Sequence, residues 1–173
     1  RIPVDDFAPS RTQRKLINRN QDLTFRLRPA EFDEQHYALY ARYIRARHAD
    51  GDMFPPSREQ YRMFLAQTHP FAKLLEFRLG DHLKAVAATD LLSHGLSAIY
   101  TFFDPDPLFE RRSLGSFAVL SQIELARKRR LPHVYLGYWI RACQKMRYKQ
   151  DYQPLEYLSG GRWQRMIPAT AFS

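Results

Sequence analysis

Hydrophobic and polar residues alternate along three neighbouring segments in the middle of the chain, which cover 75–79, 83–91 and 96–102. An alternation of this kind places one face of a β-strand in a core and the other face in solvent. Short clusters of glycine and polar residues separate the three segments and are typical of turns. The pattern therefore predicts an antiparallel meander. It ends at 104–107, because the prolines there cannot donate to a strand ladder.

A helical period governs the segments on either side of the meander. Pro29 suits the first turn of a helix whose apolar positions continue to about Arg47. Ser57 and Gln60 have the spacing of a capping box, which predicts a second helix directly after them. Further helices are predicted over 114–129 and 140–149. Shorter strands are predicted over 23–28, 133–139 and 155–158.

The predicted order is strand, two helices, three strands, a buried helix, strand, helix and strand. This order resembles the GNAT type of N-acetyltransferase fold, an α/β (α+β) fold with a mixed, splayed central sheet. In that fold the strands before and after the buried helix run parallel and then separate, which exposes backbone N–H groups to an acyl donor. Here the separating strands would be 96–103 and 133–139. The resemblance also implies that the N-terminus of the buried helix faces a phosphate group.

The chain is strongly basic, with 27 lysines and arginines against 18 acidic residues and a formal net charge of +9. This excess favours a polyanionic partner such as tRNA, DNA, anionic lipid or a phosphorylated cofactor, although a basic surface can also serve solubility alone. Arg11, Arg14, Lys15 and Arg19 recur at helical spacing within 1–22. That segment presents either a phosphate-contacting face or a solvated one.

Cysteine and histidine usage argues against a metal centre. Cys143 is the only cysteine, which excludes an internal disulfide and a metal site made of cysteines. The six histidines show no metal-ligand spacing with it. No apolar run approaches the roughly 18 residues of a membrane span, and the first residues carry no apolar signal core. We therefore expect no metal and no membrane, and a reducing cytoplasm fits this composition.

The residues 112–116, ahead of the predicted buried helix, partly resemble the phosphate-binding loop of acetyltransferases. Gly115 would let the backbone approach a phosphate, and Ser116 could donate a hydrogen bond. Phe117 stands where the last small residue of that loop belongs, and a bulky ring there would crowd a pyrophosphate. This departure counts against coenzyme A as the acyl donor, and an ordinary helix start is the alternative interpretation.

Aromatic residues and lysines are densest in the segment 135–152. Aromatic rings can stack on a terminal adenine or line a side-chain pocket, and lysines can hold a phosphate or a carboxylate. Aromatic residues on a strand are also commonly core, and lysines on a helix are commonly solvated. From the residues alone, both interpretations stay open.

The same segment resembles a known family. Tyr-Leu-Gly-Tyr-Trp-Ile at 135–140, with the lysines and tyrosines of 145–149 and the Tyr-x-Pro-x-Glu of 152–156, is similar to the signature of the arginyl-tRNA–protein transferase family. Further similar stretches lie at 7–14, 100–105 and 113–115. The resemblance covers nearly the whole chain, and the tight spacing points to the bacterial leucyl branch of the family.

The resemblance implies transfer of leucine from the 3′ end of its tRNA to the α-amine of a protein that begins with Asp or Glu. The donor ester is already activated, so neither ATP nor another cofactor is expected. The attacking amine has an ordinary pKa of about 7.7–8.0, so a fair fraction is neutral near pH 7. A modest proton acceptor and a positioned oxyanion site therefore suffice.

Candidate roles follow from this chemistry. Asp104 would orient or deprotonate the amine, backbone N–H groups near Gly137 would hold the oxyanion, and Tyr138 would protonate the leaving ribose oxygen. Lys145 and Lys149, spaced i, i+4, would share a helix face and pair with the acidic first residue. The remaining substrate-binding candidates are aromatic: Tyr100, Trp139, Tyr148 and Tyr152. The tRNA-binding candidates are basic: Arg11, Arg14, Lys15, Arg19, Arg111 and Arg112.

Structural alternatives accompany these roles. Asp104 could cap the turn before proline, Tyr138 could be core, and the lysines could be solvated. We expect 23–173 to form the aminoacyltransferase domain, with 1–22 as the remnant of an N-terminal region that is cysteine-rich in the family. The alternative functions are arginyl transfer by the same mechanism, a coenzyme A-dependent N-acetyltransferase and a non-catalytic RNA-binding domain.

Overall fold

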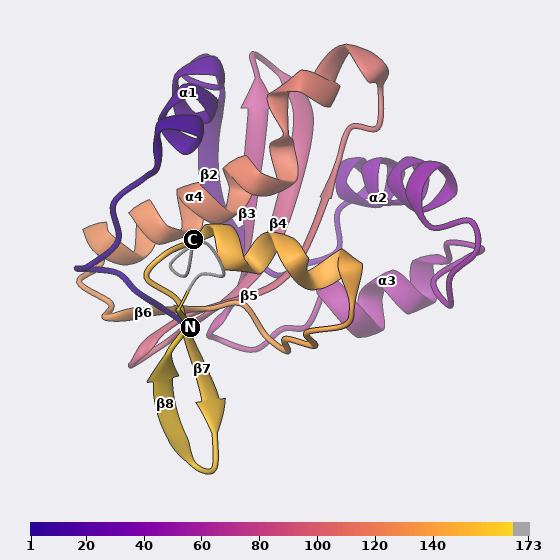
Figure 1. Cartoon of the computed structure of the whole chain (residues 1–173). Coiled ribbons are helices and arrows are strands. Elements are labelled where there is room, and N and C mark those ends of the chain that lie inside the picture. The colour runs from indigo at the N-terminus through magenta and orange to yellow at the C-terminus, as the bar shows by residue number, and fades with distance from the viewer. Residues whose placement is uncertain (168–173) are drawn as a thin grey trace.

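The computed structural model describes residues 1–167, which form a six-stranded sheet flanked by helices and a separate two-stranded hairpin (Figure 1). The strands are β1 Ile2–Pro3, β2 Thr24–Pro29, β3 Ala72–Leu79, β4 His82–Leu92, β5 Gly95–Phe103, β6 His133–Tyr135, β7 Glu156–Ser159 and β8 Arg162–Arg165. The helices are α1 Arg11–Arg19, α2 Glu34–Arg47, α3 Arg58–Leu65, α4 Leu114–Lys128 and the 3₁₀ helices η1 Pro107–Arg112 and η2 Gln144–Asp151.

The large sheet has the order β1-β6-β5-β4-β3-β2, and only β5 and β6 run parallel. Their pairing is confined to Leu96 with Val134 and Ser97 with Tyr135, while β5 continues for six residues to Phe103. The two strands therefore separate after Ser97. The predicted meander and the predicted α+β fold with a mixed, splayed sheet are confirmed.

The close approach of β5 and β6 depends on Gly95. A Cβ atom at this position would lie only 2.6 Å from the carbonyl oxygen of His133. Real Cβ atoms almost never come so near another heavy atom, so any side chain here would push the strands apart. Glycine at the start of β5 thus sets the point from which the two strands diverge.

Two helical layers cover opposite faces of the sheet. Helices α2 and α3 pack their aromatic residues, among them Tyr40 and Tyr61, against Phe102 and its neighbours. Helix α4 packs Leu114 and Ala118 on the other face, where α1 also lies (Figure 1). Burial of apolar side chains on both faces stabilises the sheet by roughly 25 cal/mol for each Å² of apolar surface removed from water.

The segment 1–22 is part of this packing. Strand β1 pairs with β6, and Ile2, Val4 and Phe7 are buried in the same cluster as residues of α4. Helix α1 begins with a full capping box, because Ser10 accepts from the Gln13 N–H while the Gln13 side chain accepts from the Ser10 N–H. This segment therefore shares the core of the domain.

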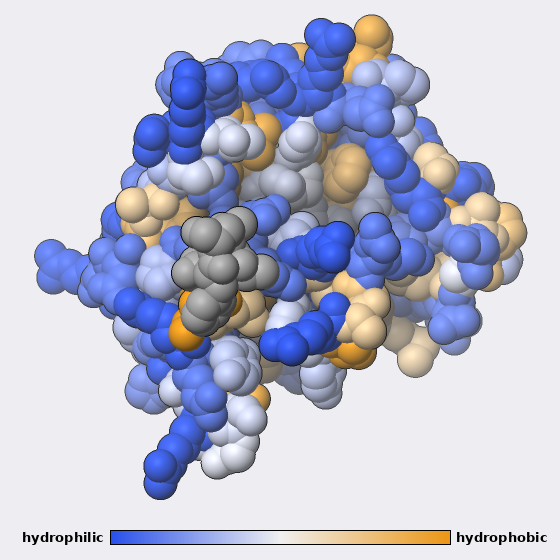
Figure 2. Space-filling model, viewed as in Figure 1, coloured by the Kyte–Doolittle hydropathy of each residue, from blue (hydrophilic) through white to orange (hydrophobic). Residues whose placement is uncertain are grey.

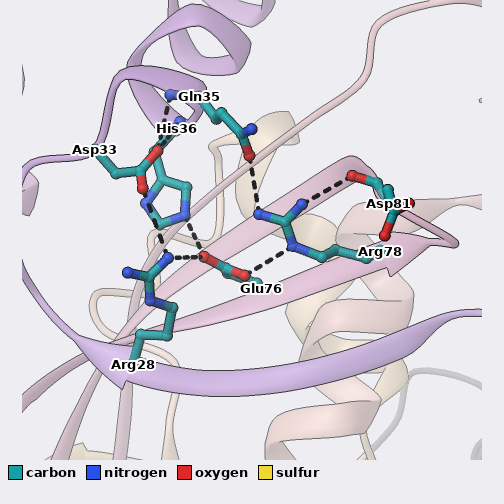
Figure 3. Close-up of polar contacts among 7 residues, drawn as sticks. All are labelled: Arg28, Asp33, Gln35, His36, Glu76, Arg78 and Asp81. Atoms are coloured by element: carbon teal, nitrogen blue, oxygen red, sulfur yellow. Dashed lines mark hydrogen bonds and ion pairs between the residues drawn. The ribbon is translucent and has the colours of Figure 1, made fainter.

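A buried polar network joins α2 to strands β2 and β3 (Figure 3). Glu76 is 1% exposed and accepts hydrogen bonds from Arg28 at 2.9 Å and Arg78 at 2.9 Å, and it lies 2.7 Å from His36. Burial raises the pKa of Glu76, but the hydrogen bonds from Arg78, His36 and Arg28 outweigh it and hold this pKa at about 2. The network is a charge-compensated element of the core.

Several predicted boundaries were wrong at the N-terminal half of the chain. Pro29 ends β2 instead of opening a helix, and α2 begins at Glu34 because the Asp33 side chain caps its first turn. The capping box expected at Ser57 is only half formed. Ser57 accepts from the Gln60 N–H, but the Gln60 side chain turns to the carbonyl oxygen of Asp52.

The C-terminal half shows larger differences. The strand predicted over 133–139 is only the three residues of β6, because Gly137 adopts a positive φ of +73° and the chain leaves the sheet. The segment predicted as a helix over 140–149 forms a turn and then η2. The predicted final strand is β7, which pairs with β8 and not with the main sheet.

The surface is mostly hydrophilic on the face shown in Figure 2, with hydrophobic residues exposed in separate patches. No helix among residues 1–167 is long and apolar enough to cross a bilayer. Within the same residues, no group of histidine, cysteine and carboxylate side chains is arranged to hold a metal ion.

Candidate active site

A cavity of about 440 Å³ opens where β5 and β6 separate. Its walls come from the second half of β5, the first turns of α4, the end of α2 and helix η2. A bulge in β5 lies beside it, since Ala88 pairs with Tyr100 and Thr89 with Ala98, which leaves Ile99 as the extra residue. Bulges of this kind re-aim side chains and are common next to active sites. We refer to this space as the splay cavity.

Two lysines of the sequence signature line the splay cavity. Lys145 is exposed, whereas Lys149 is buried and donates a hydrogen bond to the carbonyl oxygen of Tyr138. Burial lowers the pKa of Lys149. The two residues lie on a 3₁₀ helix, so the prediction that their i, i+4 spacing places them on one face of an α-helix is wrong. They nevertheless reach one cavity, because η2 lies along it.

His48 is a residue of the cavity that the sequence did not single out. It forms the C-cap of α2, lines the splay cavity, and lies 3.4 Å from the hydroxyl of Tyr43 through its Nε2 atom. Partial burial and the nearby charges of Lys145 and Arg47 lower its pKa. The available signal was its position at a helix end, immediately before the turn at 50–51, where a side chain can reach beyond the helix.

Tyrosines form much of the remaining cavity wall. Tyr100 and Tyr148 line it, and burial raises the pKa of both hydroxyls. The hydroxyl of Tyr100 is buried and has no hydrogen-bond partner among residues 1–167. Tyr152 lies behind the wall, almost fully buried, and donates to the carbonyl oxygen of Ser116 at 3.4 Å. The first two rings can contact a ligand, and the third supports the wall.

A second cavity, of about 510 Å³, lies on the other side of Lys149 and Leu136, which line both spaces. We call it the aromatic cavity, because tyrosines and tryptophans dominate its wall: Tyr135, Tyr138, Trp139, Tyr157 and Trp163. The side chain of Tyr138 is 86% exposed, so the predicted alternative of a core residue is wrong. The N–H groups of 137–139 donate no hydrogen bond to any other residue that the structure describes.

Asp104 lies at a different place from the lysines. It is buried at the end of β5, 2.9 Å from the ammonium of Lys84 and 3.7 Å from Arg42, and it accepts from the N–H of Asp106. It lines a smaller cavity of about 270 Å³ at the N-terminus of α4, which adjoins the splay cavity at Phe103, Gly115 and Ser116. Its contacts include those expected of a turn-capping carboxylate.

The predicted reason for disfavouring coenzyme A was wrong in its detail. Phe117 does not line the cavity at the N-terminus of α4, because its ring packs on Phe77 in the core with centroids 5.6 Å apart. Electrostatics supplies a better reason. That cavity is lined by the carboxylates of Asp104, Asp106 and Glu110 and by one cation, Arg47, so carboxylates outnumber cations where a pyrophosphate would lie.

The basic candidates for tRNA contact fall into two groups. Arg11, Arg14 and Lys15 are exposed on α1, and Arg14 donates to the carbonyl oxygen of Pro9 at 2.6 Å. Arg19 donates to the carbonyl oxygen of Arg111, which connects α1 to η1. The second basic residue of η1, Arg112, forms a two-pronged ion pair with Asp22 at 2.7 and 2.8 Å. Arg11, Lys15 and Arg111 are exposed and their side chains make no hydrogen bond or ion pair within residues 1–167, so they are the more available candidates.

Comparison with known proteins decides the family. The family model described as "Arginine-tRNA-protein transferase, C terminus" matches residues 35–159, which is well over half of the chain. The chain belongs to this family. It is therefore an aminoacyl-tRNA–protein transferase, and the resemblance carried by 135–156 is confirmed.

Curated relatives of this transferase carry a more specific name. An aspartate/glutamate leucyltransferase of Chromohalobacter salexigens is 71% identical over 97% of the chain and 68% of the relative. One of Pseudomonas fluorescens is 55% identical over 94% of the chain and 68% of the relative. One of Hahella chejuensis is 50% identical over 94% of the chain and 69% of the relative.

One solved structure shows similarity in fold. The structure of L-PGS from Bacillus licheniformis matches with a TM-score of 0.53 at 12% identity, over 84% of this transferase and 47% of that chain. The ribosomal-protein-S18-alanine N-acetyltransferase of Escherichia coli matches with a TM-score of 0.44 at 17% identity, over 62% of this transferase and 63% of that chain. The strand order, the parallel β5–β6 pair and the helix between them make the fold GNAT-like, as predicted.

Proposed function

We propose that this transferase moves leucine from leucyl-tRNA to the α-amine of proteins that begin with Asp or Glu, in the cytoplasm where charged tRNA is found. The observation that carries the proposal is the splay cavity itself. It places the ammonium groups of Lys145 and Lys149 and the neutral imidazole of His48 around a space with aromatic walls, beside Leu136 and the unpaired backbone N–H groups that follow it. The name of the relatives supports the choice of donor and acceptor.

The acidic side chain of the acceptor would lie among these cations. Its carboxylate would accept hydrogen bonds from Lys145 at the cavity mouth, with Lys149 deeper in the wall. A hydrogen bond to a charged partner contributes about 1.5–3 kcal/mol, which is enough to distinguish an acidic first residue from a neutral one. The same cations would repel a basic first residue.

The chemical step needs one new bond and one broken bond. The neutral amine nitrogen attacks the ester carbonyl carbon, and the oxyanion that forms accepts hydrogen bonds from the N–H groups near Gly137. The C–O bond to the ribose then breaks, the amine proton passes to a protein acceptor, and the ribose oxygen takes a proton. Tyr138 stays the predicted donor of that proton, since the residue lines the aromatic cavity and is largely exposed.

Two groups can accept the amine proton. Asp104 stays one predicted acceptor of this proton, although its two carboxylate oxygens already pair with Lys84 and Arg42. His48 has the better position, because it lines the splay cavity and its lowered pKa keeps the ring neutral near pH 7. We propose His48 as the acceptor and Asp104 as the residue that fixes the turn after β5.

The donor would enter from the opposite side of Lys149. The aromatic cavity can stack the terminal adenine of the tRNA on Trp139 or Tyr157, whose rings lie 6.4 Å apart. The basic residues of α1 and η1 would contact phosphates farther along the acceptor stem. Arginyl transfer would use the same arrangement with another side chain on the donor, and the relatives' name favours leucine.

One assay tests the proposal. The full-length protein is incubated with labelled leucyl-tRNA and with peptides that are identical except for a first residue of Asp or Ala. We expect label on the Asp peptide and at least about 10-fold less on the Ala peptide. Label on both peptides, or on neither, would contradict it. Transfer from arginyl-tRNA in place of leucyl-tRNA would support the alternative donor.

A further inference from the structure

An apolar groove continues from the splay cavity over the sheet surface next to α3. A neighbouring hollow of about 220 Å³ shares Ile99 with the splay cavity and is lined by Phe64 of α3 and by Phe71. The ring of Phe64 lies 5.5 Å from the ring of Tyr100, a residue of the splay cavity, in an edge-on arrangement. The two spaces are therefore adjacent.

Three large apolar side chains are left exposed along this groove. Phe64, Phe71 and Ile99 are 42%, 41% and 43% exposed. Ile99 is the extra residue of the bulge in β5, which explains why it points out of the regular pleat. Exposed apolar residues that line a hollow beside a reaction site mark a binding surface more strongly than isolated ones do.

The charges in the groove balance each other. Lys73 and Asp90 line it together with the imidazole of His69, and no ion pair involves Lys73 or Asp90 among the residues that the structure describes. A polyanion would gain little from one cation beside one carboxylate. The groove therefore fits an apolar chain better than a tRNA.

We infer that this groove binds the second and third residues of the acceptor polypeptide, with apolar side chains preferred there. The inference rests on the proposed function. A protein N-terminus that reacts in the splay cavity must leave the cavity along some surface, and each residue spans about 3.3 Å when extended. The aromatic cavity suits the donor and the cavity at α4 is acidic, so the groove past Ile99 is the exit for the acceptor chain.

The test uses the full-length protein, saturating leucyl-tRNA and three acceptors: aspartyl amide, a peptide beginning Asp-Gly-Gly and one beginning Asp-Leu-Leu. Phe71→Ala is the test variant, because its ring is exposed and its loss leaves the core intact. Leu108→Ala is the matched control, since Leu108 is an exposed apolar residue of η1 that lines neither cavity nor groove. Phe64→Ala is a second test variant.

We expect the unmodified protein to use the Asp-Leu-Leu peptide about fivefold better in kcat/KM than the Asp-Gly-Gly peptide. Phe71→Ala should remove most of this preference. It should leave kcat/KM for aspartyl amide and the KM for leucyl-tRNA unchanged. Equal use of the two peptides, or a preference that survives both variants, would overturn the inference. So would a rise in the KM for leucyl-tRNA. Absence of transfer to all three acceptors would instead refute the proposed function, and the inference with it.

Discussion

The ammonium group of Lys149 donates a hydrogen bond to the backbone carbonyl oxygen of Tyr138. This contact ties η2 to the segment that follows β6 and stands between the splay cavity and the aromatic cavity. The N–H groups proposed to hold the oxyanion lie in the same segment. The side chain of Lys149 thus positions the wall that both substrates would share.

Replacing Lys149 with methionine keeps most of the side-chain volume and removes the donor. We expect kcat to fall about 10- to 100-fold, because the loss of a charged hydrogen bond leaves the 137–139 segment unfixed. Arg147→Met is the control, since Arg147 is an exposed residue of the same helix. Steady-state kinetics with leucyl-tRNA and an Asp peptide make the comparison. Equal rates for the two variants would refute a positioning role for Lys149.

Replacing His48 with glutamine tests the proton acceptor. General-base catalysis contributes about 10²–10⁴-fold, so kcat should fall by at least about 10². In the unmodified protein kcat should decline as the pH falls through the pKa of His48, which lies below its usual 6.5. His48→Gln should lack this decline. If Asp104→Asn abolishes it instead, while His48→Gln keeps it, the proton passes to Asp104.

The tRNA contacts of α1 should appear in the salt dependence of binding. Each phosphate contact contributes a slope of roughly −0.7 to −0.9 in a plot of log affinity against log salt. The double variant Arg11→Gln/Lys15→Gln should therefore flatten the slope for leucyl-tRNA by about 1.5. Arg58→Gln is the control, because Arg58 of α3 already pairs with Glu34 of α2 at 3.1 Å. A slope that does not change in the double variant would show that α1 is only a solvated surface.

The buried carboxylate of Glu76 should make folding stability depend on pH. Its pKa is about 2 in the folded protein and 4.5 in the reference state. Since the folded value is the lower one, the contribution is full above about pH 5 and disappears as the pH falls towards 2. It amounts to about 3 kcal/mol.

Denaturant unfolding of Glu76→Gln measures this contribution. We expect the free energy of unfolding at pH 7 to fall by about 3 kcal/mol, because Arg28, Arg78 and His36 lose the negative charge that they share and one of its two acceptor oxygens becomes an NH2 donor. The variant should also lose less stability than the unmodified protein between pH 5 and pH 3. Glu124→Gln, whose partners Arg127 and Lys128 are at the surface, should change stability by less than about 1 kcal/mol.

The sequence predicted the parts of the fold that depend on local periodicity. The meander of β3 to β5 and helix α4 follow from alternation and helical spacing, so their positions were predictable. The course of 136–151 was not, because it is set by the positive φ of Gly137 and by the contact of Lys149 with Tyr138, which joins residues 11 positions apart. His48 was missed for a similar reason, since only the tertiary fold brings the end of α2 next to η2.

The lysines of the splay cavity are proposed to recognise an acidic first residue, and a substitution of Lys145 tests this recognition. The measurement is the ratio of kcat/KM for an Asp peptide to that for the isosteric Asn peptide, in the unmodified full-length protein and in Lys145→Met. We predict a ratio of at least about 10 that falls several-fold in the variant, with the KM for leucyl-tRNA unchanged. A ratio that stays the same in Lys145→Met, or a variant whose KM rises equally for both substrates, would contradict the account.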